Sequence, residues 1–111
     1  MQGNHTDGGA GDGIDVGDDP YNGTAGVAAN TGASTGNTIS ANVSSRNGRD
    51  GILADVTAQD SGNLFRRNTL DLNAGYDAHD LSTGSGTAGT ANTWASNSCK
   101  PPTDGSPAGI C

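Results

Sequence analysis

Asparagine returns in this chain at a fixed interval, and this regularity limits the possible fold more than any other feature of the sequence. Three asparagines spaced five residues apart are followed, 26 residues later, by three more with the same spacing. Such self-similarity indicates that one structural unit has been copied along the chain. The two sets are Asn37, Asn42 and Asn47, and Asn63, Asn68 and Asn73.

The repeat extends beyond these two sets in both directions. Asn92 and Asn97 keep the five-residue step and follow the second set after 29 residues, which is the basic interval with three residues inserted. Toward the N-terminus, Asn4 precedes Asn42 by 38 residues, and Asp-Gly-Ile occurs at 12–14 and again at 50–52 with the same interval. That interval implies an insertion of twelve residues.

These matches predict one domain made of four successive turns of a solenoid, of which the first is incomplete. The expected parts are a partial first coil at 1–16, an inserted loop at 17–35, coils at 36–61 and 62–90, and a last coil with a capping tail at 91–111.

The composition suits such a fold better than an ordinary globular one. Only 31% of the residues are hydrophobic and 4% are aromatic, while 19 are glycine and the net charge is -7. These values also describe a disordered chain, which is the alternative. The registered repeat favours a solenoid, because each coil buries only a thin strip of side chains and neighbouring coils join these strips into one core.

Short stretches between the asparagines partly alternate apolar with polar residues and are too short for helices. They predict strands of three to five residues at 38–41, 64–67 and 93–96. Superposing the coils on their asparagines predicts two stacks of inward-facing apolar side chains. The first stack contains Ile39, Phe65 and Trp94, and the second contains Ile14, Val16, Ile52, Ala78 and Ile110.

The recurring asparagines are predicted to be structural residues at the corners of the coils. Asparagine accepts the left-handed backbone conformation better than any residue except glycine. Its amide can also hydrogen-bond to the copies above and below, as in the ladders of other stacked strands. The predicted ladder residues are Asn37, Asn42, Asn47, Asn63, Asn68, Asn73, Asn92 and Asn97, and the predicted corner glycines are Gly13, Gly36, Gly48, Gly51 and Gly62.

Particular stretches carry a family resemblance. They are Gly-Asn-Thr-Ile-Ser-Ala-Asn at 36–42, Asp-Gly-Ile at 50–52, Asn-Thr-Trp-Ala-Ser-Asn-Ser-Cys at 92–99 and Pro-Ala-Gly-Ile-Cys at 107–111. Over nearly all of residues 37–111 the chain resembles the right-handed parallel β-helix repeat family, the pectin-lyase-like group of secreted proteins. The resemblance implies an all-β, single-stranded solenoid of about three to four coils, an extracellular or surface setting, and frequent action on polysaccharides.

The C-terminal tail is bracketed by Cys99 and Cys111 and contains three prolines, which cannot continue a strand ladder. An even number of cysteines in a glycine-rich chain of exported type favours a disulfide that clasps this tail as a cap. Two free, buried thiols are the alternative. Closing so short a loop is expected to stabilise the fold by about 2–3 kcal/mol.

The N-terminal end enters the repeat in mid-coil at Asn4, without a signal peptide or a capping helix. We expect an open end there, with exposed core and strand edges that favour association. The chain is therefore interpreted as the C-terminal piece of a longer protein, and the upstream coils of that protein are its expected partner. No stretch is long or apolar enough to predict a membrane span.

Carboxylates near the N-terminus suggest a cation or ligand site. Five fall within thirteen residues, at Asp7, Asp12, Asp15, Asp18 and Asp19. Calcium prefers such oxygen ligands, and Asp12, Asp15 and Asp18 form the candidate site. A solvated acidic loop is the alternative. In the inserted loop, Asp18, Asp19 and Tyr21 are candidate ligand-binding residues, and Tyr21 would stack on a sugar.

Residues 75–80, Gly-Tyr-Asp-Ala-His-Asp, are similar to the catalytic stretch of mannuronan C5-epimerases and related alginate lyases. The resemblance implies that Asp77 and His79 act as acid and base beside a uronate carboxylate. Because Ala78 is expected to point inward, both side chains are expected to point outward and to be exposed. The match is incomplete, since Ala74 and Ala78 occupy the tyrosine and proline positions of the family. A polar outer face without catalysis is the alternative.

Other functions are disfavoured by the residues present. His5 and His79 lie in different coils and lack the spacing of a zinc site. Five basic residues are too few for the footprint of a nucleic-acid-binding protein. An acidic surface would repel pectate or alginate unless calcium bridged the two. We rank a structural scaffold first, with its main groove upstream, followed by a carbohydrate-binding module and by a uronate lyase or epimerase.

Overall fold

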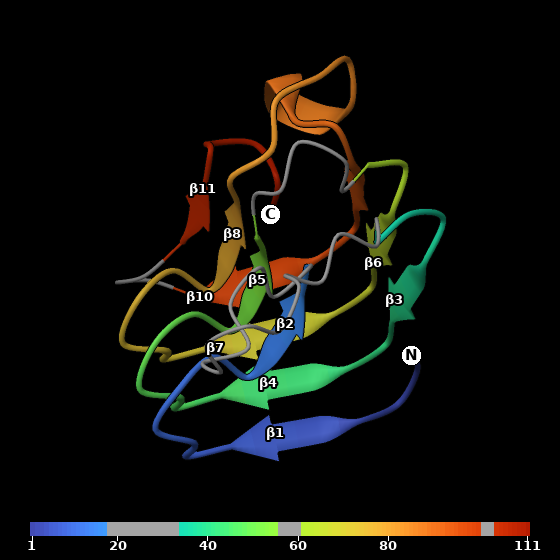
Figure 1. The fold of residues 1–111 in the computed structure, drawn as a ribbon. Coiled ribbons are helices and arrows are strands. Elements are labelled where there is room, and N and C mark those ends of the chain that lie inside the picture. The colour runs from blue at the N-terminus through green and yellow to red at the C-terminus, as the bar shows by residue number, and fades with distance from the viewer. Residues whose placement is uncertain (18–33, 56–60, 101–103) are drawn as a thin grey trace, which may run out of the picture.

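The computed structural model describes residues 1–17, 34–55, 61–100 and 104–111. Over these ranges the chain is all-β, with eleven short strands and one 3-10 turn, η1 (Thr87–Gly89) (Figure 1). The strands are β1 (His5–Asp7), β2 (Ile14–Val16), β3 (Thr38–Ser40), β4 (Val43–Ser45), β5 (Ile52–Ala54), β6 (Leu64–Arg66), β7 (Thr69–Asp71), β8 (Ala78–Asp80), β9 (Thr93–Ala95), β10 (Ser98–Lys100) and β11 (Gly105–Ser106).

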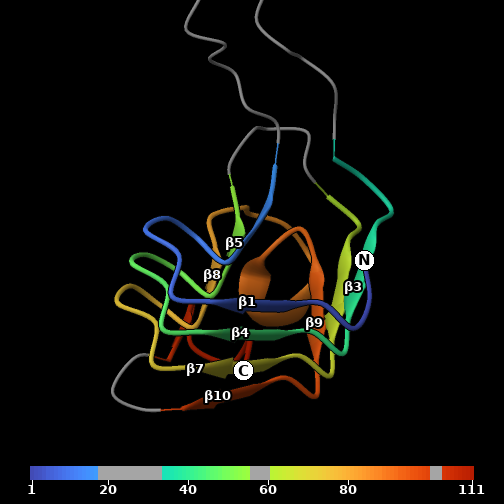
Figure 2. The same cartoon turned by 90° about the horizontal axis from the view of Figure 1, so that it is seen from below.

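The strands form three parallel sheets, and each sheet takes every third strand of the chain. The first sheet has the order β3-β6-β9, the second β1-β4-β7-β10 and the third β2-β5-β8-β11. In Figure 2 the strands of the second sheet lie side by side, with β3 and β9 to one side of the sheet and β5 and β8 to the other. Strand pairing follows the intervals of the sequence, because Ile39 pairs with Phe65 and Phe65 with Trp94.

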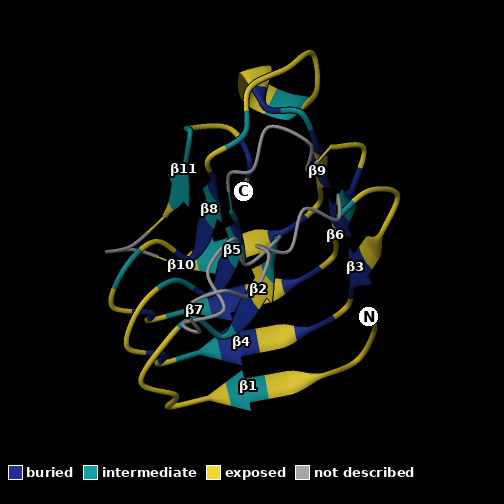
Figure 3. Cartoon of the chain, viewed as in Figure 1, coloured by how far each residue is buried: buried dark blue, intermediate teal, exposed yellow. Residues whose placement is uncertain are grey.

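One hydrophobic cluster collects side chains from all three sheets. Figure 3 shows buried residues in strands of each sheet. The predicted first stack is confirmed: Ile39, Phe65 and Trp94 are all buried. The rings of Phe65 and Trp94 are stacked with centroids 4.1 Å apart, an arrangement that adds to the stability gained by burial alone. Leu70 of the second sheet is also fully buried, and the sequence analysis did not predict it.

The predicted second stack is correct except at Val16 and at its last member. Val16 pairs with Ala54, beside the stack, and is only partly buried. Ile14 pairs with Ile52 and Ile52 with Ala78, and all three are buried. Ala78 then pairs with Gly105 rather than with Ile110. Ile110 is buried nonetheless, because it folds over Gly105, where an added Cβ would lie 2.8 Å from its Cγ1. The tail therefore fills the core position that the missing side chain of Gly105 leaves.

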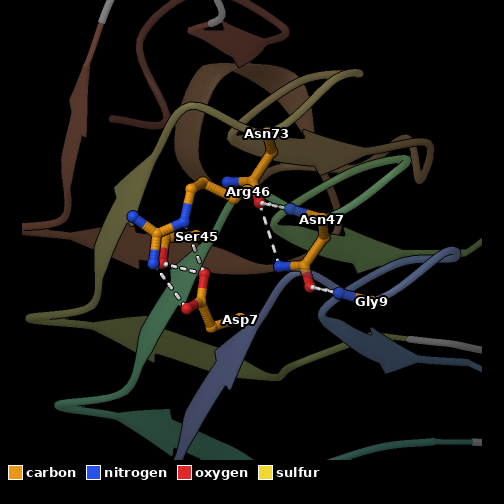
Figure 4. Close-up of polar contacts among 6 residues, drawn as sticks. All are labelled: Asp7, Gly9, Ser45, Arg46, Asn47 and Asn73. Atoms are coloured by element: carbon orange, nitrogen blue, oxygen red, sulfur yellow. Dashed lines mark hydrogen bonds and ion pairs between the residues drawn. The ribbon is translucent and has the colours of Figure 1, made fainter.

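The asparagine ladders are confirmed, and they follow a single bonding rule. Each asparagine that has a counterpart in the next unit donates its backbone N–H and an Nδ2 hydrogen to Oδ1 of that counterpart. Asn42 bonds to Asn68 in this way at 3.0 Å for both contacts, and Asn68 bonds to Asn97 likewise. Figure 4 shows the same pattern between Asn47 and Asn73.

The remaining hydrogen of the amide bonds in the opposite direction. Nδ2 of Asn68 donates to the carbonyl of Ile39 at 3.0 Å, and Nδ2 of Asn97 donates to the carbonyl of Phe65 at 3.1 Å. A buried carboxamide would otherwise lose its hydrogen bonds to water without replacement. The ladder residues are therefore buried at little cost.

The left-handed backbone falls on the residue before the ladder asparagine, so the prediction that asparagine itself adopts it is wrong. Ala41, Arg67 and Ser96 have φ values of 53°, 55° and 57°. Gly36 and Gly62 hold the corresponding places before Asn37 and Asn63, with φ of 68° and 69°. The turn comes one residue early because the asparagine must aim its own N–H along the ladder.

The remaining predicted corner glycines serve close packing instead. An added Cβ at Gly51 would lie 2.5 Å from the carbonyl oxygen of Asp77 in the next unit. Gly13 and Gly48 are similarly crowded by Ser44 and by the backbone of Ala10.

The predicted disulfide between Cys99 and Cys111 is present, with the two Cα atoms 5.7 Å apart, and the alternative of two free thiols is wrong. Cys99 lies in β10 and packs against the core. The bridge ties the C-terminal residue to the outermost strand of the second sheet.

Replacing Asn68 with leucine tests the ladder, because leucine has a similar volume but no hydrogen-bonding groups. Asn42 would lose the single acceptor of both its backbone N–H and its Nδ2 hydrogen, and we expect the free energy of unfolding to fall by about 2–4 kcal/mol. Urea titration followed by circular dichroism measures this. The exposed neighbour Thr69→Ala is the control and should change stability by less than about 0.5 kcal/mol. Equal stability of the two variants would contradict the role of the ladder.

Reduction of the disulfide should lower the free energy of unfolding by about 3 kcal/mol in the chain-entropy description of a short loop. The measurement compares urea midpoints of the oxidised protein and of the Cys99→Ser, Cys111→Ser double variant. Ser98→Ala in the same strand is the control. A double variant as stable as the oxidised protein would show that the tail is held by packing of Ile110 alone.

Candidate functional site

The predicted catalytic pair does not share a face. Asp77 precedes β8 and is fully buried, whereas His79 lies within β8 and is partly exposed. The expectation that both side chains point outward is therefore wrong. Strand alternation does not extend to Asp77, because this residue occupies the corner before the strand begins.

Asp77 instead closes an asparagine ladder. Its Oδ1 accepts Nδ2 of Asn73 at 2.8 Å and the backbone N–H of Asn73 at 3.3 Å. Its Oδ2 accepts the backbone N–H of Lys100 at 2.9 Å. Both oxygens are therefore engaged in holding the fold, and Asp77 has no exposed surface with which to contact a substrate.

Asp80 closes a second ladder in the same manner, and the sequence analysis did not identify it. Its Oδ2 accepts Nδ2 of Asn92 at 3.1 Å and the indole N–H of Trp94 at 2.7 Å. Its Oδ1 accepts the backbone N–H of Ser82 at 2.9 Å. A carboxylate can only accept hydrogen bonds. It can therefore end a series of amides in which each member donates to the next unit toward the C-terminus.

His79 bonds to an aspartate from the preceding unit. Its Nδ1 lies 2.7 Å from Oδ2 of Asp50, and the two side chains are 21% and 13% exposed. The ring of Tyr76 lies 4.8 Å from the ring of His79, tilted by 55°, and Tyr76 is 45% exposed. Asp50, Tyr76 and His79 thus form one partly open cluster, which we call the Tyr76 cluster.

Backbone contacts fix this cluster from beneath. Oδ1 of Asp50 accepts the backbone N–H of Tyr76 at 2.6 Å, and the N–H of Asp50 itself donates to Oδ1 of Asp12 at 2.9 Å. Asp50 therefore uses one oxygen for the backbone and the other for the imidazole. The Asp-Gly-Ile repeat was the signal that could have identified Asp50, since it places Asp50 one unit before Tyr76.

The chemistry of the Tyr76 cluster follows from the Asp50–His79 contact. An ionised carboxylate only accepts hydrogen bonds, so Nδ1 of His79 is the donor in this contact, and Nε2 is the ring nitrogen that Asp50 does not engage. The exposed ring of Tyr76 offers an apolar face with a polar hydroxyl. The cluster can therefore contact a polyhydroxylated ligand through one aromatic face and through hydrogen bonds, or take a proton at Nε2.

The predicted ligand-binding residues Asp18, Asp19 and Tyr21 lie outside the described residues, and so does one of the three predicted calcium ligands, Asp18. Of the described members, Asp12 accepts the N–H of Asp50, and Asp15 lies in β2 opposite Leu53. In the parts of the chain that the structure describes, no three His, Cys, Asp or Glu residues gather at metal-binding distance. The calcium site stays a prediction.

Basic residues are paired on the surface. Arg46 bonds to Asp7 from the adjacent strand, with its Nε 2.9 Å from Oδ1 (Figure 4). The hydrogen bond from the Arg46 guanidinium lowers the pKa of the Asp7 carboxyl below its ordinary value. Arg49 lies near Asp12, and Lys100 lies near Asp71. Exposed pairs such as these contribute little to stability.

Comparison with known proteins gives no match: no family model, no curated protein and no solved structure is similar to this chain. Within the described ranges, no helix has the length and apolar character that crossing a membrane requires.

Asp77→Asn distinguishes a ladder-closing role from a catalytic one. The new Nδ2 would face the N–H of Lys100, donor against donor, and we expect the free energy of unfolding to fall by about 1–3 kcal/mol. Urea titration measures the loss. Asp71→Asn, which removes a partly exposed surface pair with Lys100, is the matched control and should cost less than about 1 kcal/mol. A fully stable Asp77→Asn variant would contradict the structural assignment.

Proposed function

We propose that this chain is the C-terminal portion of a secreted, right-handed parallel β-helix protein, which serves as a structural scaffold that contacts carbohydrate and has its main groove in upstream coils. The observation that carries the scaffold proposal is the directed ladder. Two of its columns end in buried carboxylates, at Asp77 and Asp80, and the tail beside them is held by a disulfide. These features suit the terminal end of a stack of coils.

The arrangement of strands supports a β-helix. Each sheet takes every third strand, all pairs are parallel, and residues 26 apart occupy equivalent places in neighbouring strands. A chain that advances through three sheets in turn and returns to the first beside its earlier strand is building successive coils. The disulfide supports an extracellular or surface location, because such bonds persist in oxidising compartments.

The carbohydrate contact is assigned to the Tyr76 cluster. Sugars present apolar C–H faces and many hydroxyls, and the cluster offers one exposed aromatic ring with an imidazole and a carboxylate beside it. The repeat holds these groups on a rigid sheet, which limits the entropy lost when a ligand binds.

Binding to a panel of neutral, amino-bearing and uronate glycans tests this assignment, with and without calcium. Tyr76→Ala should weaken binding about tenfold, as expected for losing roughly 1.4 kcal/mol of ring contact. Leu72→Ala removes another exposed side chain and should leave affinity unchanged; Leu72 is 53% exposed. If no glycan binds, or if both variants bind like the parent chain, the carbohydrate assignment is wrong.

A second function, that of a uronate lyase or mannuronan C5-epimerase, is favoured by the Asp50–His79 contact. In this proposal Nε2 of His79 takes the proton from C5 of a uronate, and Asp50 takes the orienting role expected earlier of Asp77. A lyase then expels the C4 oxygen and leaves a C4=C5 double bond. The same glycan panel decides the matter. Ultraviolet absorbance of an unsaturated uronate reports a lyase, and inversion at C5, measured by NMR of the uronate, reports an epimerase. Either signal, if it is lost in His79→Gln, supports the enzyme, and the absence of both leaves the scaffold.

A further inference from the structure

The ladder has a direction, and this makes its two ends chemically different. Within each column, a ladder asparagine donates its N–H and an Nδ2 hydrogen to Oδ1 of the asparagine in the following unit. Asn4 donates to Asn42 at 2.9 and 3.1 Å, and Asn37 donates to Asn63 at 3.0 and 3.1 Å. Among the residues that the structure describes, none donates to Oδ1 of Asn4 or of Asn37.

The strands at this end of the molecule are the outermost strands of all three sheets. β1 and β2 end the orders of the second and third sheets, and Gln2 extends the first sheet by pairing with Ser40. A hollow of about 220 Å³ opens beside them, lined in part by Met1, Val16 and Ile39. We call residues 1–7, β2 and Asn37 the N-terminal edge. It presents the Oδ1 acceptors of Asn4 and Asn37, the outer edges of the strands and a shallow hollow of mixed polar and apolar lining.

We propose that the N-terminal edge is an interaction surface for one further parallel β coil of the same polypeptide, which carries asparagines above Asn37 and Asn4. This inference rests on the proposed function and names the partner of that scaffold by its chemistry. The coil must bring N–H and carboxamide donors to both of these corners, because the edge offers an Oδ1 acceptor at each of them. The asparagine above Asn37 would stand five residues before Asn4 in the sequence, and the asparagine above Asn4 would belong to the turn before that. The third corner, at Gly9, has no side chain and uses only its backbone N–H, which donates to Asn47 at 3.1 Å.

A second copy of the chain meets this requirement at only one of the two corners. Head-to-tail stacking would set Asn97, which has donors, above Asn4, but it would also set Asp80, which ends the column of Asn37, above that same asparagine. A carboxylate and a carboxamide oxygen would then face each other as two acceptors. Head-to-head stacking would oppose the unfilled Oδ1 atoms of both copies. Only a coil that presents hydrogen-bond donors to the N-terminal edge satisfies the Oδ1 acceptors at both corners.

A short extension provides the test. Met1 precedes Gln2, which pairs with Ser40, so the sequence Gly-Asn-Thr placed directly before Met1 would set its asparagine above Asn37. Gly-Asp-Thr is the matched control, with the same length and backbone but a side chain that only accepts. We expect the asparagine extension to raise the Tm by about 4 °C relative to the aspartate extension. We also expect its backbone N–H to become protected from hydrogen exchange.

Two further measurements separate the possible failures. Asn37→Leu in both extended chains should abolish the difference in Tm, because it removes the acceptor. Equal Tm values for the two extensions would overturn the inference, whereas the Asn68→Leu test would still decide the ladder and with it the proposed scaffold. Sedimentation of the unextended chain as a dimer, lost on adding the asparagine extension, would make a second copy the occupant and would also overturn the inference.

Discussion

Where one ladder asparagine follows another, its Oδ1 accepts two hydrogen bonds from the preceding one, and this contact stabilises the corners of the structure. A non-glycine residue in the left-handed region costs about 1–2 kcal/mol. Ala41, Arg67 and Ser96 all adopt it directly before a ladder asparagine. An unpaired buried carboxamide would add a similar cost. The ladder offsets both, and it does so in a chain whose 31% hydrophobic content provides only a thin core.

The same rule explains why a stretch that resembles a catalytic motif became structural. In such a column each amide donates its hydrogen bonds to the next one, so the last amide needs an acceptor. The group that ends the column should have no hydrogen-bond donor of its own. Asp77 and Asp80 meet that need at two columns, each by accepting Nδ2 of the last asparagine. Asp77 therefore lies beneath the surface on which His79 is exposed. Chemistry at this face, if it involves a carboxylate, falls to Asp50.

The repeat interval was enough to predict strand pairing, because residues at equivalent places in successive units must lie opposite each other in a parallel sheet. Ile39, Phe65 and Trp94 follow directly from it. Alternation along a strand predicts side-chain direction only inside the strand, and the outward placement of Asp77 was wrong because Asp77 lies at a corner. The predicted position of Ile110 was wrong because the tail leaves the strand register of the third sheet after β11. The contact between Asp50 and His79 joins side chains of different types from different units. The repeat predicts contacts between copies of the same residue, so it could not predict this one.

The Tyr76 cluster lies where the residue types at equivalent positions of the repeat change. Asp12 and Asp50 hold equivalent positions, and each accepts the backbone N–H of the unit that follows, in the opposite sense to the asparagine ladder. The next equivalent residue is Tyr76, so this short aspartate series stops. His79, in the adjacent strand, holds the position equivalent to that of Leu53, and its Nδ1 contacts the second oxygen of Asp50. A regular scaffold fixes the positions, and two departures from its sequence place an aromatic ring and an imidazole nitrogen on its surface. Function on such a fold is therefore best sought at the residues that break the repeat while the backbone beneath them keeps it.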